Sequence, residues 1–586
     1  MSAIIEMECV SFSYDTAADG AYALKDIDLS VEEGTFVGLI GPSGAGKSTL
    51  ASAITGAIPH HYRGRLFGST LVAGLDTCEA SLTDIAKVVG SVLQDIDAQM
   101  VASVVEDELL FGLENFGIDH REIEGRIASA LDAVGIADLR HREIATLSGG
   151  QKQKVAIAAI LAMAPRVIVM DEPTSALDPA SARDVFEALR RAKELTGMTV
   201  VLIEQTVALL AEYCDRVVVI DQGRIALDGT PTDVFSHGET LRAIGVDTPR
   251  TVRISNSLAE AGLAPNDSPA LTLDGAEALV AGILAPGLSK SSPIVPCALG
   301  DGPDARNTVD ERPIIVDVAG AAYSYGTGQA CIEGIDLTVR AGEILAVVGQ
   351  NGAGKTTFTK LLNGLIKPSA GVVRIAGLDT RTTPVSVLAS HAATLFQNPD
   401  RQLCRNTVVE EISFGLELQG APAEAARERA RHVASTFGLP ENASPFNLSR
   451  GQRQMVALAS VVALEPELII LDEPTNGLDY RECMTVMETV RQRALDGAAV
   501  VMVCHDMEVV SDFADTLAVM TEGRLIEVGP SREVFANDAL LAHARIAAPC
   551  VPALGKRLAA RFHPSFARIT EVTDLVGLVK ELKAHA

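Results

Sequence analysis

The chain has 586 residues, enough for more than one domain at roughly 150 residues each, and 47% of its residues are hydrophobic. Its 49 Lys and Arg against 76 Asp and Glu give a formal net charge of −27, which argues against nucleic acid as a partner. Its nine cysteines are scattered without a C-x-x-C pair, so we expect reduced thiols in a cytosol rather than disulfides or a zinc site.

The first predicted elements are two alternating strands, residues 4–12 and 23–31, separated by a turn around Asp19 and Gly20. No basic stretch followed by an apolar segment precedes them, so we expect no signal peptide. Tyr14 follows the first strand, where its ring can stack on a nucleotide base. An ordinary tyrosine at a strand end is the alternative.

A glycine-rich loop comes next, Gly41-Pro-Ser-Gly-Ala-Gly-Lys-Ser-Thr49, between an apolar strand over residues 36–40 and a helix-compatible segment over residues 50–54. It fits G-x-x-x-x-G-K-[ST], in which backbone N–H groups and a helix N-terminus converge on phosphate oxygens. The lysine is expected to reach the β- and γ-phosphates, and the serine hydroxyl to face Mg²⁺. A chance match in a glycine-rich turn is the alternative. The expected ATP ligands are Gly41, Ser43, Gly44, Gly46, Lys47, Ser48 and Thr49.

A strand over residues 87–93 then ends at Gln94, and an acidic stretch follows. An apolar helix over residues 155–163 comes later and is stopped by Pro165, well short of the roughly 18 apolar residues that cross a bilayer. A membrane function would therefore need another chain for the span. The helix is preceded by a Leu-Ser-Gly-Gly-Gln segment that can bind a γ-phosphate, although Ser-Gly-Gly alone is only a capping turn. The expected ligands in it are Ser148, Gly149, Gly150 and Gln151.

Two more buried strands end in polar residues. Residues 167–170 precede Asp171 and Glu172, and Thr199–Ile203 precedes Glu204 and Gln205. Beside a phosphate loop, the aspartate can hold Mg²⁺ through water and the glutamate can polarise an attacking water. An N-cap is the alternative for the two carboxylates. Strands alternating with helices imply a parallel sheet with crossover helices.

The same landmarks recur at a nearly constant offset. Lys47 and Lys355 are 308 residues apart, and Gln205 and His505 are 300 apart. Such an offset predicts duplication of a whole domain. The second copy contributes Tyr325, Gly349, Asn351, Gly352, Gly354, Lys355, Thr356, Thr357, Gln397, Ser449, Arg450, Gly451, Gln452, Asp472, Glu473 and His505. A weaker sequence similarity relates the segments that follow the two copies, residues 258–279 and 558–575. It predicts two small helical appendages.

This motif set resembles two ATP-binding-cassette (ABC) ATPase domains fused in tandem. The resemblance implies an α/β fold in which each P-loop domain has a mixed sheet core, a helical subdomain and a small helical C-terminal appendage. We expect ABC domains at residues 4–245 and 314–545, appendages at 246–285 and 546–586, and a Pro-, Ser- and Gly-rich flexible linker at 286–313.

The resemblance also implies ATP and Mg²⁺ as cofactors. It places the two D-loops at Asp178 and Asp479. The expected catalytic residues are Glu172, Glu473, His505 and Gln205. The expected metal contacts are Ser48, Gln94, Asp171, Thr356, Gln397 and Asp472.

A narrower resemblance rests on Phe396-Gln-Asn-Pro-Asp-Arg-Gln402 and Glu410-Glu-Ile-Ser-Phe-Gly415, with looser versions at residues 93–99 and 106–112. These stretches, like the helical tails, are similar to those of the ATPase subunits of energy-coupling factor (ECF) transporters, which import vitamins or transition-metal ions. The resemblance implies a transmembrane coupling subunit and a membrane-embedded substrate-binding subunit in other chains, no nucleic acid, and a peripheral position on the cytoplasmic face of the membrane. Candidate contacts to basic residues of the coupling subunit, or otherwise a plain solvated face, are Asp97, Asp400 and Glu411.

Two other functions remain open. A fused ATPase of a sugar or peptide importer is disfavoured by the Gln-Asn-Pro-Asp stretch. A soluble tandem ATPase acting on ribosomes is disfavoured by the acidic charge and by the Pro-, Ser- and Ala-rich linker.

The resemblance implies head-to-tail pairing, in which each ATP lies between the phosphate loop of one copy and the Ser-Gly-Gly-type segment of the other. Site one then joins Lys47, Asp171 and Glu172 to Ser449, and site two joins Lys355, Asp472 and Glu473 to Ser148 and Gly149. Both departures between the copies, Gln205 for His505 and Arg450 for Gly149, fall in site one. A glutamine cannot exchange a proton near neutral pH, and an arginine can tighten phosphate binding. We therefore hypothesise that site one binds ATP but turns over slowly; two working sites are the alternative, because Glu172 is present.

Overall fold

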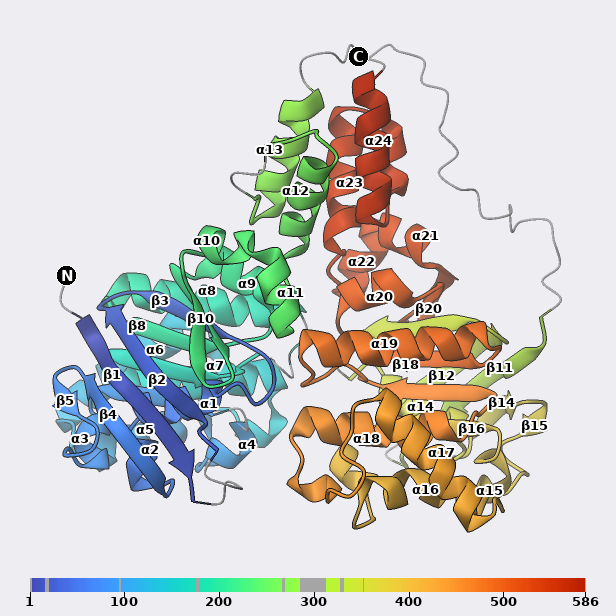
Figure 1. The fold of residues 1–586 in the computed structure, drawn as a ribbon, viewed down its shortest axis with the longest axis horizontal. Helices are drawn as coiled ribbons and strands as arrows, with labels where there is room; N and C mark the ends of the chain where they lie inside the picture. The colour runs from blue at the N-terminus through green and yellow to red at the C-terminus, as the bar shows by residue number, and fades with distance from the viewer. Residues whose placement is uncertain are drawn as a thin grey trace. The chain divides into compact units, whose positions relative to one another are not determined.

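The computed structural model describes residues 3–15, 21–93, 96–174, 177, 179–265, 269–284, 312–326, 331–350 and 352–584 (Figure 1). Gln94, Asp178, Asn351 and nearly all of the expected linker lie outside these residues. The chain forms two compact units, residues 1–252 with 267–272 and residues 253–266 with 273–586. Among the described helices, none combines the length and the apolar character that a bilayer span requires.

The first unit contains two sheets. The smaller is antiparallel with strand order β2-β1-β4-β5, and the larger has the order β10-β9-β3-β8-β7-β6. In the larger sheet only the β9–β10 pair is antiparallel, so this sheet is mixed, as predicted. The strands are β1 Ala3–Tyr14, β2 Leu24–Glu32, β3 Phe36–Ile40, β4 Gly64–Val72, β5 Leu75–Asp76, β6 Val89–Val92, β7 Val167–Asp171, β8 Thr199–Ile203, β9 Arg216–Asp221 and β10 Arg224–Gly229. The helices are α1 Lys47–Ile54, α2 Ala57–His60, α3 Leu82–Ala86, α4 Ile96–Gln99, α5 Val105–Asn115, α6 His120–Ala133, α7 Gly149–Ala162, α8 Pro179–Thr196, α9 Val207–Tyr213, α10 Pro231–Ser236 and α11 Gly238–Ile244.

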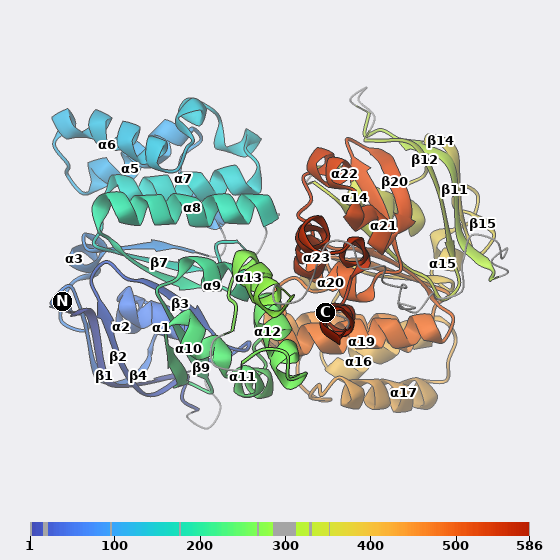
Figure 2. The same cartoon turned by 90° about the horizontal axis from the view of Figure 1, so that it is seen from above.

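The central strands are buried on both faces, which explains their unbroken apolar runs. In β7, Ile168 and Met170 belong to the core that also contains α7 and α8, whereas Val167 and Val169 belong to the core shared with β1, β2 and α1. Helices α7 and α8 lie side by side over the first of these faces (Figure 2). The predicted strand over residues 87–93 is shorter in the structure, Val89–Val92.

The second unit repeats both sheets, with orders β12-β11-β14-β15 and β16-β17-β18-β13-β19-β20. Again only the last pair of the larger sheet, β19–β20, is antiparallel. The strands are β11 Ile314–Tyr323, β12 Ile332–Arg340, β13 Ile344–Gly349, β14 Ala370–Ile375, β15 Leu378–Asp379, β16 Ala392–Leu395, β17 Leu468–Asp472, β18 Ala499–Val503, β19 Thr516–Thr521 and β20 Arg524–Pro530. The helices are α14 Lys355–Leu362, α15 Val385–Leu388, α16 Val408–Leu418, α17 Ala423–Thr436, α18 Arg450–Ala463, α19 Tyr480–Leu495, α20 Met507–Phe513, α21 Ser531–Ala536 and α22 Asp538–Ala544.

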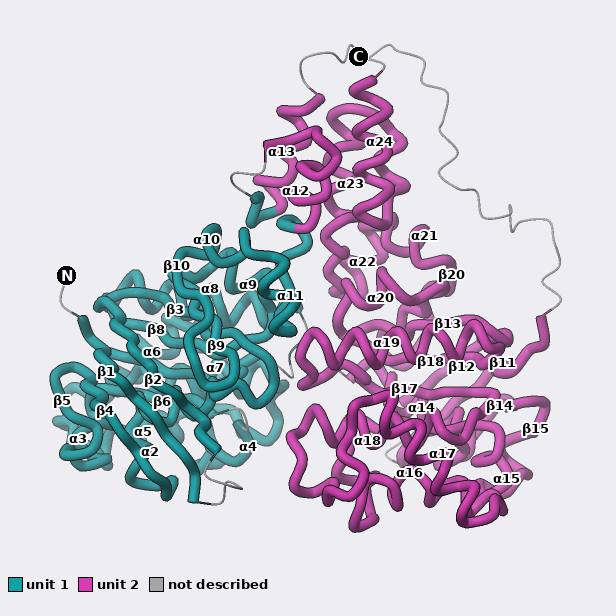
Figure 3. Tube along the Cα trace, in the orientation of Figure 1, with its two compact units in different colours: residues 1–252, 267–272 teal, residues 253–266, 273–586 magenta. Residues whose placement is uncertain are grey.

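Helices also follow each copy, as predicted for the appendages. They are α12 Arg250–Glu260 and α13 Leu273–Leu284 after the first copy, and α23 Cys550–Arg561 and α24 Val572–Ala584 after the second. Figure 3 shows α13 and most of α12 as part of the second unit, where α13 packs on α23 and α24. Arg557 on α23 pairs with Asp274, and its Nη1 lies 3.6 Å from Oε2 of Glu277, so charge complements the apolar contact.

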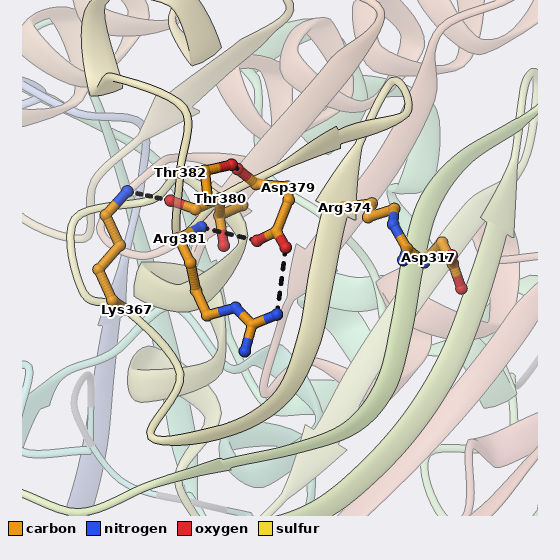
Figure 4. Close-up of polar contacts among 7 residues, drawn as sticks. All are labelled: Asp317, Lys367, Arg374, Asp379, Thr380, Arg381 and Thr382. Atoms are coloured by element: carbon orange, nitrogen blue, oxygen red, sulfur yellow. Dashed lines mark hydrogen bonds and ion pairs between the residues drawn. The ribbon is translucent and has the colours of Figure 1, made fainter.

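In the smaller sheet of the second unit, Lys367 fixes the loop after β15. Its ammonium donates to the carbonyl of Thr380 (Figure 4). It also donates to the carbonyl of Thr383 at 3.3 Å. In the first unit, His60 Nε2 lies 2.9 Å from the corresponding carbonyl, that of Thr77. The two copies thus use different side chains, Lys367 and His60, to bond the same backbone carbonyl after the short strand. Two ion pairs complete this region of the second unit, Arg374 with Asp317 and Arg381 with Asp379.

Candidate functional site

Each phosphate loop leaves a strand flanked on both sides by parallel neighbours and turns directly into a helix. In the first unit, β3 lies between β8 and β9, and α1 begins at Lys47. Gly44 and Gly46 have φ angles of 76° and 106°, a region that side chains other than glycine rarely adopt. A Cβ on Gly46 would lie 2.5 Å from the carbonyl oxygen of Ala23. The loop can therefore follow this path only with glycine at that position.

The lysines of both loops are buried and fold back over their own loops. Lys47 Nζ donates to the carbonyls of Gly41 and Pro42 at 2.8 and 2.9 Å. Lys355 Nζ makes the same two bonds in the second copy, at 2.8 Å each. The two copies therefore place the ammonium group alike, inside the loop where phosphate oxygens would bind.

The two predicted aromatic residues lie beside their loops. The Tyr14 hydroxyl is 3.1 Å from the hydroxyl of Thr49, and the Tyr325 hydroxyl is 3.4 Å from that of Thr357. In the second copy the thiol of Cys331 is also 3.3 Å from Thr357. Tyr325 is 54% exposed, so a ring face is available to a base.

The acidic pairs sit at the carboxyl ends of β7 and β17, adjacent to the phosphate loops. Asp171 and Asp472 are the last residues of these strands. Glu172 and Glu473 follow with φ angles of 47° and 54°, in the left-handed region that is costly for a glutamate. Their amides donate to the last residues of β8 and β18 at 2.9 Å each. Strain of this kind, held by the surrounding sheet, is characteristic of functional residues.

Gln205 and His505 follow strands β8 and β18 at corresponding places, which we call the switch positions, and each contacts the glutamate of its own copy. Gln205 Nε2 donates to Glu172 Oε1 at 2.6 Å, and His505 Nε2 lies 3.0 Å from Glu473 Oε1. Glu473 receives two further amide bonds on its other oxygen, from Gln397 at 3.0 Å and from Asn476 at 3.2 Å. The geometry is alike in the two copies, but the chemistry of the donor differs.

The pKa of the glutamate is shifted in opposite directions in the two copies. Burial raises the pKa of Glu172, the charges of Glu204 and Asp171 add to this, and the bond from Gln205 only partly offsets it. Burial also acts to raise the pKa of Glu473, but the hydrogen bond and charge of His505, with the two amide bonds, bring that pKa below its usual value. Glu473 is therefore the more readily ionised glutamate.

The aspartates provide oxygens suited to a divalent cation. Oδ1 of Asp472 is buried and has no hydrogen-bond partner among the described residues. Burial, with the charge of Glu473, raises the pKa of Asp472 to about 6, while Lys355 and a hydrogen bond with Thr356 act in the opposite direction. Burial likewise raises the pKa of Asp171, against a hydrogen bond with Ser48. A buried acceptor without a donor, beside a loop hydroxyl, fits Mg²⁺, which takes one or two protein oxygens and leaves its other positions to phosphate and water.

The two Ser-Gly-Gly-type segments begin long helices through capping boxes. Ser148 accepts from the amide of Gln151 at 3.3 Å, and the side chain of Gln151 accepts from the amide of Ser148 at 3.0 Å. Ser449 and Gln452 repeat this arrangement at 3.2 and 3.1 Å. The capping turn was the alternative to phosphate binding, and the structure has that turn in both copies; phosphate binding there stays a prediction.

Arg450, the first residue of α18, is exposed and lies over the D-loop turn of its own copy. A Cβ on Gly477 would be 3.4 Å from its Nε. Asp479, at the end of that turn, caps α19 by accepting from the amide of Glu482 at 2.8 Å.

Two glutamines to which the sequence analysis assigned no role, Gln99 and Gln402, bond back to the residues directly after strands β6 and β16. Gln99 accepts from the amide of Leu93 at 2.8 Å, and Gln402 accepts from that of Phe396 at 3.3 Å. Both side chains also donate to nearby carbonyls. The equal spacing of Gln94–Gln99 and Gln397–Gln402 was the signal for this pairing.

The expectation that Glu411 contacts a partner chain is wrong. Glu411 is 4% exposed, and its Oε2 accepts the amides of Cys404 and Arg405 at 2.8 and 2.7 Å, as Glu108 does for Val101 and Ala102 in the first copy. A carboxylate placed in this way orders a loop and cannot reach another molecule.

The other two carboxylates proposed for docking are at the surface. Asp97 pairs with Lys152 at 2.6 Å, and Asp400 pairs with Arg453 at 2.7 Å. Each ion pair joins the stretch that resembles ECF ATPases, residues 93–99 or 396–402, to a helix of the same copy. That helix is α7 in the first copy and α18 in the second, and each is preceded by its Ser-Gly-Gly-type turn.

Comparison with known proteins agrees with the motif set. The family model described as ABC transporter matches residues 24–175 and 332–476. An ABC transporter ATP-binding protein of Caldanaerobacter subterraneus subsp. tengcongensis is 35% identical over 94% of this chain and 96% of its own. One from Methanosarcina mazei is 35% identical over 100% of this chain and 98% of its own. Among solved structures, cbiO1 from Clostridium perfringens, part of the ABC transporter complex cbiONQ, is 31% identical with a TM-score of 0.38, covering 42% of this chain and 95% of that one.

Proposed function

The chain belongs to the ABC transporter family as a tandem ATPase, and from this premise we propose that it energises a membrane importer of the ECF type. Its cargo would be a micronutrient: a vitamin, a vitamin precursor or a transition-metal ion. A transmembrane coupling subunit and a membrane-embedded substrate-binding subunit in other chains would complete the importer on the cytoplasmic face of the membrane. ATP would bind with Mg²⁺ held by Ser48 and Asp171 in the first copy and by Thr356 and Asp472 in the second.

The observation that carries the proposal is the fold of residues 396–402. Asn398 caps a short 3₁₀ helix, Pro399–Arg401, and accepts from the amide of Asp400 at 2.9 Å. Gln402 ties this turn back to the strand end, and Asp400 ties it to α18 through Arg453. Asn398, Asp400 and Gln402, three polar residues of the stretch that resembles ECF ATPases, thus hold one turn together.

This turn supports coupling to a membrane partner. It lies between Gln397, which contacts Glu473, and α18, whose N-cap is Ser449. In the first copy, Asp97 and Lys152 make the corresponding ion pair to α7. A helix of a coupling subunit docked on these segments would therefore move with the nucleotide site, as closure on ATP and reopening after hydrolysis require.

We further propose that the two ATP sites are composite and unequal. Site two, with Lys355, Glu473 and His505, would carry most hydrolysis, whereas site one, with Gln205, would bind ATP and turn over slowly. The lowered pKa of Glu473 and the raised pKa of Glu172 support this inequality. Under the head-to-tail arrangement, Ser148 would complete site two, and Ser449 with Arg450 would complete site one.

The test is isolation of the whole complex. The chain, tagged and expressed with the membrane proteins encoded beside it, should be purified from detergent-solubilised membranes with two small integral membrane proteins and a bound small molecule, which mass spectrometry would identify. The variant pair Asp97→Lys and Asp400→Lys should lose the membrane proteins while still hydrolysing ATP. Recovery with ribosomes, or with a periplasmic-type binding protein, would overturn the assignment.

A further inference from the structure

A buried glutamate near the switch position of the first copy is not explained by the catalytic residues discussed so far. Glu204 directly follows β8 and is 3% exposed. Its Oε1 accepts the amides of Gln205 at 2.8 Å and Thr206 at 3.1 Å. Its Oε2 accepts the hydroxyl of Thr174, two residues after Glu172. The carboxylate thus bridges the switch segment and the turn that carries the catalytic glutamate.

These contacts close a ring. From Glu172 the chain runs to Thr174, which bonds Glu204; Glu204 fixes the amide of Gln205; and the Gln205 side chain returns to Glu172 at 2.6 Å. The acceptor carboxyl of Glu204 is buried, so water does not compete for these bonds and they are stronger than they would be at the surface. The ring leaves Gln205 little freedom to leave Glu172.

The second copy lacks this ring. Cys504 occupies the corresponding position, and among the described residues its thiol makes only long contacts, 3.9 Å to the Thr475 hydroxyl and 3.7 Å to the carbonyl of Asp506. There the switch segment is held by Asp506, which caps α20 by accepting from Glu508 and Val509. In the first copy, Thr206 stands at that cap position and makes no side-chain cap.

We propose that Glu204 is a positioning residue for ATP hydrolysis at site one, holding the switch backbone so that the Gln205 amide stays on Glu172. It compensates for the missing helix cap, and it acts through Gln205 rather than on the nucleotide. The proposal rests on the catalytic roles assigned above to Glu172 and Gln205.

The experiment compares Glu204→Leu and Glu204→Gln in full-length chains that also carry Glu473→Gln, so that site two is silent. Leucine fills the space without an acceptor, whereas glutamine keeps an acceptor for both amides. We expect Glu204→Leu to lower the remaining kcat about tenfold with KM for ATP within about twofold, and Glu204→Gln to stay within about threefold of the parent. Cys504→Ala, the matched change in the second copy, should leave this activity unchanged.

Hydrogen exchange of the amides of Gln205 and Thr206 is measured on the same chains, and it should accelerate at least about tenfold in Glu204→Leu only. Unchanged exchange, or unchanged kcat, would overturn the proposal, and so would equal loss of kcat in the leucine and glutamine variants. If the parent with Glu473→Gln hydrolyses no ATP, the turnover assigned to site one is wrong, and the exchange result alone decides whether Glu204 holds the segment.

Discussion

Replacing His505 by glutamine is the most direct test of why the two sites should differ. Gln205 shows that a glutamine at this position reaches the neighbouring glutamate, at 2.6 Å against 3.0 Å for His505. His505→Gln should therefore keep a hydrogen bond to Glu473 and remove only the ability to carry charge and exchange a proton.

The expected loss follows from that difference. Glu473 is the acceptor in both chains, so the substitution keeps a hydrogen bond to the same carboxylate and removes only the attraction that a protonated histidine adds, about 1–1.5 kcal/mol, between the values for two unit charges in water and near a protein surface. The side chains of His505 and Glu473 are only 21% and 17% exposed, so solvent screens this pair weakly. If the cost falls on the transition state, kcat should decrease about tenfold while KM for ATP stays nearly constant.

The assay is steady-state phosphate release by the purified full-length chain across a range of ATP concentrations. Gln205→Ala is the matched control, because it removes the switch side chain from site one; under unequal sites it should change total kcat by less than about twofold. Similar losses in His505→Gln and Gln205→Ala would refute the reasoning that histidine chemistry separates the sites.

Three further results are expected. Glu473→Gln should remove most of the ATPase activity, about a hundredfold, and Glu172→Gln little of it; equal losses in phosphate release would contradict unequal sites. Asp472→Asn should raise the Mg²⁺ concentration for half-maximal activity about tenfold at fixed ATP, and an unchanged requirement would exclude Asp472 as a metal contact. Gly46→Ala forces a Cβ to 2.5 Å from a carbonyl oxygen at φ 106°, so it should lower the melting temperature and ATP affinity more than Gly117→Ala, where φ is 67° and the space is open. Equal effects of these two glycine variants would show that backbone strain alone matters.

Much of the fold follows from local patterns. Strands such as Phe36–Ile40 and Thr199–Ile203 are apolar throughout because both faces are buried, and each is followed by the polar residues of the site. The start of α7 at Gly149, six residues before the predicted helix, depends on the capping box of Ser148 rather than on apolar periodicity. Strands β9 and β10, which pair antiparallel, contain no recognisable motif, and the sequence analysis did not predict them.

The residues that support the site were harder to predict because their roles depend on tertiary neighbours. Glu411 looked like a surface carboxylate in an acidic stretch, but two backbone amides fold over it. Glu204 gave no signal beyond its place before Gln205, because its partner Thr174 comes from a different strand end. The spacing of Gln397 and Gln402 was visible, but its meaning required the strand end of β16.

The two copies have nearly the same hydrogen-bond geometry at the residues expected to bind the nucleotide. They differ in residue type at the positions expected to take part in hydrolysis. The lysine-to-carbonyl distances and the capping boxes match within about 0.1 Å, as do the amide bonds of the two strained glutamates. The differences gather at residues 204–206 and 504–506 and at Arg450. Under the proposed head-to-tail arrangement this division is sufficient for a transport cycle. In that arrangement two bound nucleotides would stabilise the closed state together, and hydrolysis at site two would remove part of that stabilisation and so favour opening. A site one that holds ATP through several cycles would then cost the importer no speed and would save one ATP per cycle.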